Sequence, residues 1–330
     1  MTIETADLSF TVEDGETILG AARRNGIYLP FECGWGSCGT CKATLISGEI
    51  RYLLENPPAI SERDRKRGRI AICQATPVSD VILRASVLER LPEHLQTRDV
   101  CAVVESIVEV TPDLTHFYLR PEEAVSYEPG QYAIFRLGPE LRRAYSMANL
   151  PGDEAGLEFI IRRYPGKPGS EAVFRLRPGS RVMLEFPYGG AYFRMTGRPN
   201  VLVAGGTGIA PMLAIARALV ARRADPGIGE FPHYLFYGAR SPVDLAGLEA
   251  LYALSARFPQ LAVVPVVDVP DAEWRGETGL VTDVLERRLS EPWSAYTFYV
   301  AGPPVMVNAV VRRLRDRGVP LTQVYYDAFG

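Results

Sequence analysis

The sequence lacks a long hydrophobic run, because no apolar stretch approaches the ~20 residues that a membrane-spanning helix needs. Its first residues, MTIETADLSFTVEDG, do not show the basic and then apolar segments of a secretory signal peptide. It also lacks an excess of charge, since 36 basic and 39 acidic residues give a net charge of −3. Such a balance does not favour nucleic acid or an anionic membrane as a partner. We therefore expect a protein that binds neither. We also expect it to be cytoplasmic and monomeric.

Histidine is scarce, with three residues far apart in the sequence: His94, His116 and His233. A non-haem iron oxygenase site needs two histidines and a carboxylate, and a Rieske cluster needs two histidines. The separation of these residues argues against both kinds of site. We therefore expect that the chain does not itself activate oxygen.

Cysteine is also infrequent, yet four of the five residues fall into one pattern. The spacing C-x4-C-x2-C is followed by one more cysteine far downstream; the four residues are Cys33, Cys38, Cys41 and Cys73. This is the ligand pattern of a plant-type [2Fe-2S] cluster. Glycines between the first three cysteines let the backbone turn towards the sulfurs; they are Gly34, Gly36 and Gly39. The pattern predicts an iron–sulfur cluster.

Disulfides or a structural zinc site are the alternatives for these thiols. Zinc ribbons favour two C-x2-C pairs, whereas only one is present here. The fifth cysteine, Cys101, lies in an apolar segment, and we expect it to be a buried, inert thiol. A thiol without a partner fits a reducing compartment.

The pattern of apolar residues changes along the 330-residue chain, whose length predicts two or three domains. In the first part, Thr17 predicts the start of a helix and Gly26 its end. A polar segment marks the first boundary, and short alternating segments typical of an antiparallel β-barrel follow. The last part alternates strand and helix patterns, which favours a doubly wound parallel sheet. We place the domains at 1–92, 93–197 and 198–330.

The segment Pro57–Arg69, PPAISERDRKRGR, is polar and strongly basic. We expect Ser61 to cap a short exposed helix in it. The charges have two interpretations, a solvated helix face or a docking patch for an acidic partner. The sequence leaves both open.

Three short strings carry a resemblance to a known family. RAYSMAN (143–149), AGPP (301–304) and the terminal DAF (327–329) look closest to reductases of the carbazole-dioxygenase type. With the cysteine pattern, the whole chain resembles the single-chain reductases of bacterial aromatic-ring-hydroxylating oxygenases. The resemblance implies a β-grasp ferredoxin domain, an antiparallel β-barrel that binds FAD, and a doubly wound α/β domain that binds NAD.

The resemblance places the flavin at the motif R-x-Y-S, formed by Arg143, Tyr145 and Ser146. An arginine fork suits a pyrophosphate, an aromatic ring can lie on the flavin, and a hydroxyl can donate near flavin N5. We therefore assign Tyr145 and Ser146 catalytic as well as binding roles. The alternative is that the arginine and tyrosine only pack.

A second segment, RRYPGKPGSEAVF, is expected at the flavin pyrophosphate. Gly169 loosens a turn and Ser170 opens a helix, whose free N–H groups suit an anion. The resemblance adds Arg162 to this site. A pyrophosphate site implies FAD rather than FMN.

The loop Gly205-Gly206-Thr207-Gly208 joins a predicted strand to a predicted helix. Its backbone N–H groups and the helix N-terminus are expected to hold the phosphates of the nicotinamide cofactor. The loop matches neither G-x-G-x-x-G nor a Walker A motif. A purely structural glycine turn is the alternative.

Two charged residues follow the next predicted strand, where the family places the adenosine half. Asp244 could accept a hydrogen bond from the ribose 2′-OH and would repel a 2′-phosphate, which favours NADH. Arg240, a cation, favours NADPH instead. The family uses this arginine with NADH too, and we expect NADH.

Gly302 and Pro303, in AGPP, are expected to shape the nicotinamide pocket, and Ala301 stands where many relatives carry cysteine. The family places a C-terminal aromatic residue against the flavin, which implies a catalytic position for Phe329. A frayed terminus is the alternative.

The resemblance implies an oxidoreductase that passes electrons from NADH to FAD, then to the [2Fe-2S] cluster. The acceptor would be the ferredoxin or the terminal oxygenase of an aromatic-ring-hydroxylating dioxygenase system. A di-iron monooxygenase or a cytochrome P450 is an alternative acceptor. A redox-sensing module is an alternative of another class, and no DNA-binding or signalling segment supports it.

Overall fold

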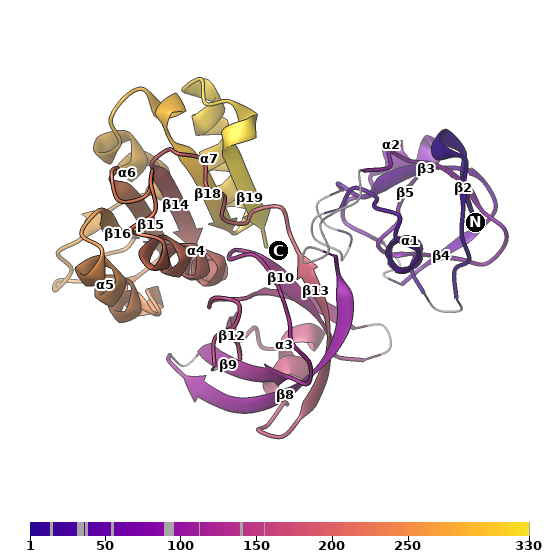
Figure 1. Cartoon of the computed structure of the whole chain (residues 1–330), viewed down its shortest axis with the longest axis horizontal. Helices are drawn as coiled ribbons and strands as arrows, with labels where there is room; N and C mark the ends of the chain where they lie inside the picture. Colours follow the sequence, from indigo (N-terminus) through magenta and orange to yellow (C-terminus); the bar gives the residue numbers. More distant parts are fainter. Residues whose placement is uncertain are drawn as a thin grey trace.

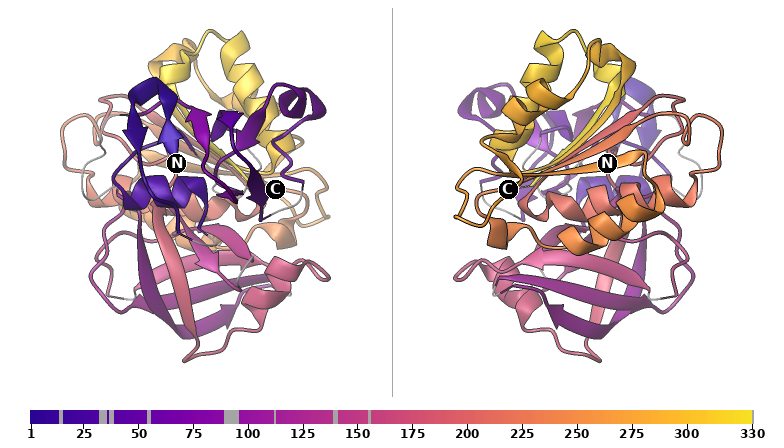
Figure 2. Two further views of the ribbon diagram at one scale, coloured as in Figure 1. Left: turned by 90° about the vertical axis from the view of Figure 1, so that its right-hand side faces the viewer. Right: turned by 90° about the vertical axis from the view of Figure 1, so that its left-hand side faces the viewer.

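Three large sheets, one in each domain, divide the chain in the order that the sequence predicts, and the predicted fold class is confirmed (Figure 1). The structure is a computed structural model, and it describes residues 1–13, 16–31, 36, 39–53, 56–88, 96–111, 113–138, 141–154 and 156–329. The barrel lies below the parallel sheet, and the N-terminal domain lies beside both (Figures 1 and 2). The domain boundaries stay predictions; the first of them lies outside the described residues.

The N-terminal domain is a five-stranded mixed sheet with the order β2-β1-β7-β3-β5, in which β1 runs parallel to β7. Its elements are β1 (Thr2–Ile3), β2 (Leu8–Ser9), α1 (Ile18–Arg24), β3 (Lys42–Ser47), α2 (Glu62–Lys66), β5 (Arg69–Ala71) and β7 (Ile82–Arg84), with β4 (Ile50–Tyr52) and β6 (Ala75–Pro77) as a separate pair. As predicted, Thr17 caps α1 and Ser61 caps α2. Helix α1 ends two residues before Gly26, whose φ is +69°. The arrangement is the β-grasp fold, with a core of its own.

The second sheet is a six-stranded antiparallel barrel with the order β11-β10-β13-β8-β9-β12. Its elements are β8 (Arg98–Glu109), β9 (Leu114–Pro121), β10 (Tyr132–Arg136), β11 (Arg142–Ser146), β12 (Leu157–Arg162), α3 (Pro168–Phe174) and β13 (Arg181–Tyr188). A bridge between Met147 and Phe159 brings the two end strands together and nearly closes the barrel.

Cys101 is half-buried, so the expectation of a buried thiol is wrong. It lies in β8 between Val100 and Ala102, which are 1% and 0% exposed and belong to the barrel core. Because side chains alternate along a strand, the thiol points to the opposite face.

The third sheet is parallel throughout, with the order β17-β16-β15-β14-β18-β19. Its elements are β14 (Asn200–Gly205), α4 (Ile209–Ala221), β15 (His233–Ala239), α5 (Leu248–Arg257), β16 (Leu261–Val267), β17 (Glu277–Thr278), α6 (Val281–Arg288), β18 (Thr297–Gly302), α7 (Pro304–Asp316) and β19 (Val324–Ala328). In β14, Leu202 and Ala204 pack with α4 and α5, whereas Val201 and Val203 pack with α6 and α7. Helices therefore cover both faces, as a doubly wound sheet requires.

The barrel and the C-terminal domain share one continuous hydrophobic core, because Leu114, Ala148 and Ile160 of the barrel pack with α4. At the same junction, Arg217 of α4 forms an ion pair with Glu158. Burial opposes ionisation of this carboxyl, but hydrogen bonds from His116 and Arg217 lower its pKa below the usual value. The two domains therefore pack as one unit.

The N-terminal domain contacts the barrel through aromatic rings. Phe31 packs edge-on against Tyr188 with ring centroids 4.9 Å apart, and Tyr188 stacks on Tyr132 at 5.7 Å. The guanidinium of Arg23 lies 4.4 Å from the centre of the Tyr188 ring and donates to its hydroxyl. Burial lowers the pKa of Arg23 to about 10, so its charge persists at neutral pH.

No helix in the described part of the chain is both long enough and apolar enough to cross a membrane.

Candidate functional site

Two of the four predicted cluster ligands meet in the core of the N-terminal domain. The Sγ atoms of Cys41 and Cys73 lie 3.2 Å apart, and both residues are buried. A disulfide would hold them ~2.05 Å apart. Two buried soft thiolates at this distance suit binding to one iron. The other two predicted ligands, Cys33 and Cys38, and Gly34 beside them, lie outside the described residues.

The remaining glycines of the cluster loop occupy positions that a side chain cannot easily fill. Gly36 has a φ of +89°, and an added Cβ would lie 2.8 Å from Gln74 and 3.2 Å from Pro57. Gly39 has a φ of +80°. Glycine alone adopts such backbone angles without strain, which accounts for its use in this loop.

The two predicted parts of the flavin site meet at Gly169. An added Cβ at Gly169 would lie 2.2 Å from Nε of Arg143, so the arginine side chain crosses directly over the start of α3. Helix α3 begins at Pro168, and Ser170 lies in its first turn rather than opening it. The cause is the fixed φ of proline, which suits the first helical position. The Oγ of Ser170 accepts from the backbone N–H of Tyr164 at 2.7 Å.

Tyr145 and Ser146 end strand β11, opposite Ala133 and Tyr132 of β10. Tyr145 is half-buried and meets Phe135 edge-on, with ring centroids 5.0 Å apart. Burial raises the pKa of its hydroxyl well above the usual value, so the phenol stays protonated. Ser146 is buried. Both residues can therefore act near the flavin only as neutral groups.

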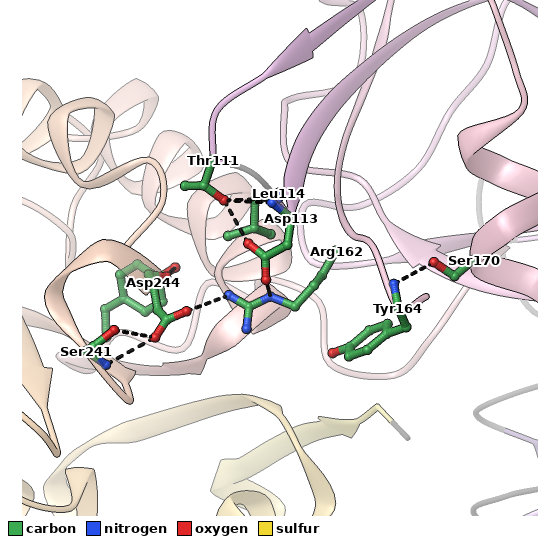
Figure 3. A network of polar contacts seen from close by, with 9 residues as sticks. Thr111, Asp113, Leu114, Arg162, Tyr164, Ser170, Ser241 and Asp244 are labelled. Carbon is green, nitrogen blue, oxygen red and sulfur yellow. Dashed lines mark hydrogen bonds and ion pairs between the residues drawn. The ribbon is translucent and has the colours of Figure 1, made fainter. Parts of the chain in front are cut away.

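Arg162 lies between two carboxylates that come from different domains (Figure 3). Its Nε is 3.3 Å from Asp113, and its Nη2 is 3.4 Å from Asp244 of the C-terminal domain. The resemblance assigned Arg162 to the flavin pyrophosphate and placed Asp244 at the adenosine half, and the structure brings them together. Asp113 was not predicted, because an aspartate two residues after Thr111 is also an ordinary turn signal.

Asp244 has partners for both carboxylate oxygens. Its Oδ1 faces Arg162, and its Oδ2 accepts from the N–H and hydroxyl of Ser241 at 3.1 and 2.7 Å. Arg240 is exposed at the end of β15. Both residues follow the C-terminal end of β15, where the adenosine half is expected.

The glycine loop packs against the end of β18. Gly205 ends β14, and Gly206, Thr207 and Gly208 form a single 3-10 turn before α4. An added Cβ at Gly208 would lie 2.0 Å from the carbonyl oxygen of Ala301. Strands β14 and β18 are neighbours at the point where the strand order reverses, which is where doubly wound sheets bind ligands.

The AGPP turn and the C-terminus lie against the same loop. Gly302 has a φ of +150°, and its added Cβ would lie 2.9 Å from the carbonyl oxygen of Gly205. Pro303 precedes α7. The backbone N–H of Phe329 donates to the carbonyl of Gly302 at 2.9 Å, and its half-buried ring packs on the shared core. The C-terminus up to Phe329 is therefore held in place, which argues against fraying.

Known proteins match the three domains in the same order. Three family profiles match: a 2Fe-2S iron-sulfur cluster binding domain over residues 1–78, an oxidoreductase FAD-binding domain over 101–193, and an oxidoreductase NAD-binding domain over 202–312. The ferredoxin–NAD(P)+ reductase CarAd of Metapseudomonas resinovorans is 36% identical, over 97% of this chain and 96% of its own length. The chain belongs to this family of single-chain ferredoxin–NAD(P)+ reductases. Its cofactors are FAD, a [2Fe-2S] cluster and NADH, and it is an oxidoreductase.

Solved structures match the reductase over nearly its whole length. The ferredoxin reductase in carbazole 1,9a-dioxygenase has a TM-score of 0.84 and 33% identity, over 96% of this chain and 94% of that chain. The Amycolatopsis cytochrome P450 reductase GcoB has a TM-score of 0.82 and 29% identity, over 97% and 96%. The first of these relatives is named for a dioxygenase and the second for a cytochrome P450.

The residues present fit the cofactors. Cys41 and Cys73 supply soft, buried ligands for iron, and the positive φ of the loop glycines lets the backbone approach a cluster. Gly208 and Gly302 let the loop pack directly on the end of β18, and an added Cβ at Gly206 would meet no atom within 4 Å, so the loop backbone stays open to a phosphate. Arg143 supplies a cation at the start of α3 for the flavin pyrophosphate.

Proposed function

We propose that the reductase passes electrons from NADH to the ferredoxin or terminal oxygenase of an aromatic-ring-hydroxylating dioxygenase system. When bound, FAD would convert the two-electron hydride into single electrons, and the [2Fe-2S] cluster would carry them one at a time. The observation that carries the proposal is the contact between Phe31 and Tyr188. Phe31 precedes the predicted ligand Cys33 by two residues, so this contact holds the residue that leads into the predicted ligand segment against the flavin barrel.

Each group around the flavin has a proposed role that matches its position. Arg143 and the first turn of α3, with Gly169 and Ser170, bind the pyrophosphate. Tyr145 lies along the flavin ring, and Ser146 donates a hydrogen bond near N5. Their support is the meeting of Arg143 with Gly169 and the neutral state of two hydroxyl side chains, of which Tyr145 is half-buried and Ser146 is buried.

The nicotinamide cofactor is proposed to bind along the ends of β14, β15 and β18. The loop Gly205–Gly208 takes its phosphates, and Gly302 and Pro303 border the nicotinamide. Arg240 and Asp244 meet the adenosine half. Arg162 lies within ion-pair distance of Asp244, so an incoming phosphate would compete with this carboxylate for the guanidinium.

The reductase is expected to prefer NADH over NADPH by at least about tenfold in kcat/KM, or ~1.4 kcal/mol. The reason is Asp244, which would repel a 2′-phosphate. Steady-state kinetics with both nucleotides measure the preference. In the Asp244→Asn variant the preference should shrink, while in Arg240→Gln it should remain. A tenfold preference of the unmodified protein for NADPH would contradict the assignment and show that Arg240 dominates.

Phe329→Ala is expected to tighten NADH binding by about threefold to tenfold, which corresponds to the free energy of one aromatic contact. The ring must leave the flavin before the nicotinamide can stack there, so its removal eliminates this competition. Stopped-flow reduction of the flavin at several NADH concentrations gives the affinity, and FAD content should not change. Tyr326→Ala, which removes an exposed ring three residues earlier, is the matched control. Kinetics of Phe329→Ala equal to those of the unmodified protein would place the ring away from the flavin.

A cytochrome P450 is the second candidate acceptor, because a P450 reductase matches 97% of the chain. Reconstituted turnover with a dioxygenase system and with a P450 distinguishes them. The proposed function predicts substrate hydroxylation coupled to NADH use with the dioxygenase system.

A further inference from the structure

We propose that an exposed basic face on and around α2 docks an acidic surface of the protein that takes electrons from the cluster. The basic face consists of Arg63, Arg65, Lys66, Arg67 and Arg69. The inference rests on the proposed function, because it names the contact surface and the charge of its acceptor.

The five side chains of the basic face are exposed and carry a surplus of one sign. Arg65 donates to the amide oxygen of Asn56, and no salt bridge joins any of the five to a described residue. Helix α2 also carries two acidic residues: Glu62 is exposed at its start, whereas Asp64 is turned inward. Hydrogen bonds from Ser61 and Lys42 lower the pKa of Asp64 to about 2, and its negative charge is paired with Lys42 of the same domain.

Three acidic side chains elsewhere in the domain have basic partners. Glu4 pairs with Arg84, and Glu13 and Glu16 pair with Arg24. These pairs balance charge on the surfaces where they lie. The basic face, in contrast, keeps an excess of positive charge. A helix face that serves only solubility needs no such excess, whereas a docking surface for an acidic protein does.

The basic face adjoins the cluster loop directly. Lys42, which follows the ligand Cys41, holds Asp64 of α2 at 3.0 Å. Just before α2, the N–H of Ala59 donates to the carbonyl of Gly36 in the cluster loop at 2.9 Å. A protein bound to α2 would therefore contact the rim of the cluster site.

The position of Phe31 leaves the basic face available. Phe31 contacts the flavin barrel at one end of the cluster loop, whereas Gly36 and Gly39 contact the segment before α2. Electrons can therefore enter the cluster on the barrel side and leave on the α2 side.

The test replaces three charges of the basic face with neutral side chains in the full-length holoprotein, Arg63→Gln, Lys66→Gln and Arg67→Gln together. None of the three side chains forms a hydrogen bond or an ion pair with a described residue, and α2 keeps its Ser61–Asp64 cap, so folding should be preserved. The matched control makes the same change of charge at exposed positions of the C-terminal domain, Arg257→Gln, Arg312→Gln and Arg315→Gln. Cytochrome b5, an acidic haem protein, and cytochrome c, a basic one, serve as probes.

At ~0.01 M salt, where screening is weak, the α2 variant should reduce cytochrome b5 at least about tenfold more slowly than the unmodified protein and bind it more weakly in calorimetry. The difference should vanish near 1 M salt, and the control variant should behave like the unmodified protein. Reduction of cytochrome c should not slow. Equal rates for the α2 variant and the unmodified protein with cytochrome b5, or equal losses in the control variant, would overturn the proposal.

A second measurement separates this proposal from the proposed function. Anaerobic mixing of each protein with NADH, without any acceptor, follows reduction of flavin and cluster by absorbance. If NADH does not reduce the cluster of the unmodified protein, the proposed function fails. If NADH reduces the clusters of all three proteins equally, and the α2 variant binds and reduces cytochrome b5 like the unmodified protein, the docking role of the basic face is wrong and the proposed function stands.

Discussion

Cys73→Ala is expected to remove the [2Fe-2S] cluster while FAD remains bound at one per chain. The thiolate is buried 3.2 Å from that of Cys41, and alanine leaves one iron without a ligand. Alanine is preferable to serine here, because a serine oxygen can still bind iron. The barrel should keep its flavin, since its core is separate from that of the N-terminal domain.

Iron and acid-labile sulfide analysis, with the visible spectrum, measures this result. Oxidation of NADH with ferricyanide, a small acceptor, should continue at a rate close to that of the unmodified protein. Cys101→Ala is the matched control, because this half-buried thiol lies in the barrel strand β8 and should not affect the cluster. Full cluster content in the Cys73→Ala protein would show that the fourth ligand lies elsewhere.

Gly208→Ala is expected to lower kcat/KM for NADH by at least about 100-fold, or ~2.7 kcal/mol. The new Cβ would lie 2.0 Å from the carbonyl oxygen of Ala301, so the loop or the end of β18 must shift. Either shift displaces the backbone N–H groups that are proposed to hold the phosphates. Initial rates at several NADH concentrations measure the loss.

Gly190→Ala is the matched control for that substitution. No atom lies within 4 Å of its added Cβ, and its φ is not positive, so activity should change little. Thermal unfolding of both variants shows whether the loss reflects folding. A Gly208→Ala protein with ordinary stability and ordinary kcat/KM would remove the loop from the nucleotide site.

Features that leave a recognisable pattern of residue types in the sequence could be predicted. Cysteine spacing predicted that Cys41 and Cys73 would meet, and alternation of strand and helix patterns predicted the parallel sheet. The hydroxyls of Thr17 and Ser61 predicted helix starts, because a serine or threonine before a helix accepts from its free N–H groups.

Features that depend on packing between distant segments could not be predicted in the same way. Arg162 and Asp244 are 82 residues apart and lie in different domains, so their ion pair exists only because the barrel and the parallel sheet share a core. The start of α3 was misplaced because Pro168, which fixes its own φ, outweighed the serine two residues later. The contact of Phe31 with Tyr188 gave no signal in the sequence, since both are ordinary apolar positions.

The most direct test of the account is reduction of a protein acceptor by the Cys73→Ala variant. The protein is mixed anaerobically with NADH and the ferredoxin or oxygenase of a dioxygenase system, and the absorbance of flavin and acceptor is followed. We predict that the flavin is reduced at a rate close to that of the unmodified protein, while the acceptor is reduced at no more than a trace rate. Reduction of the acceptor at the rate of the unmodified protein would show that electrons leave from the flavin and contradict the assignment of the cluster as the exit.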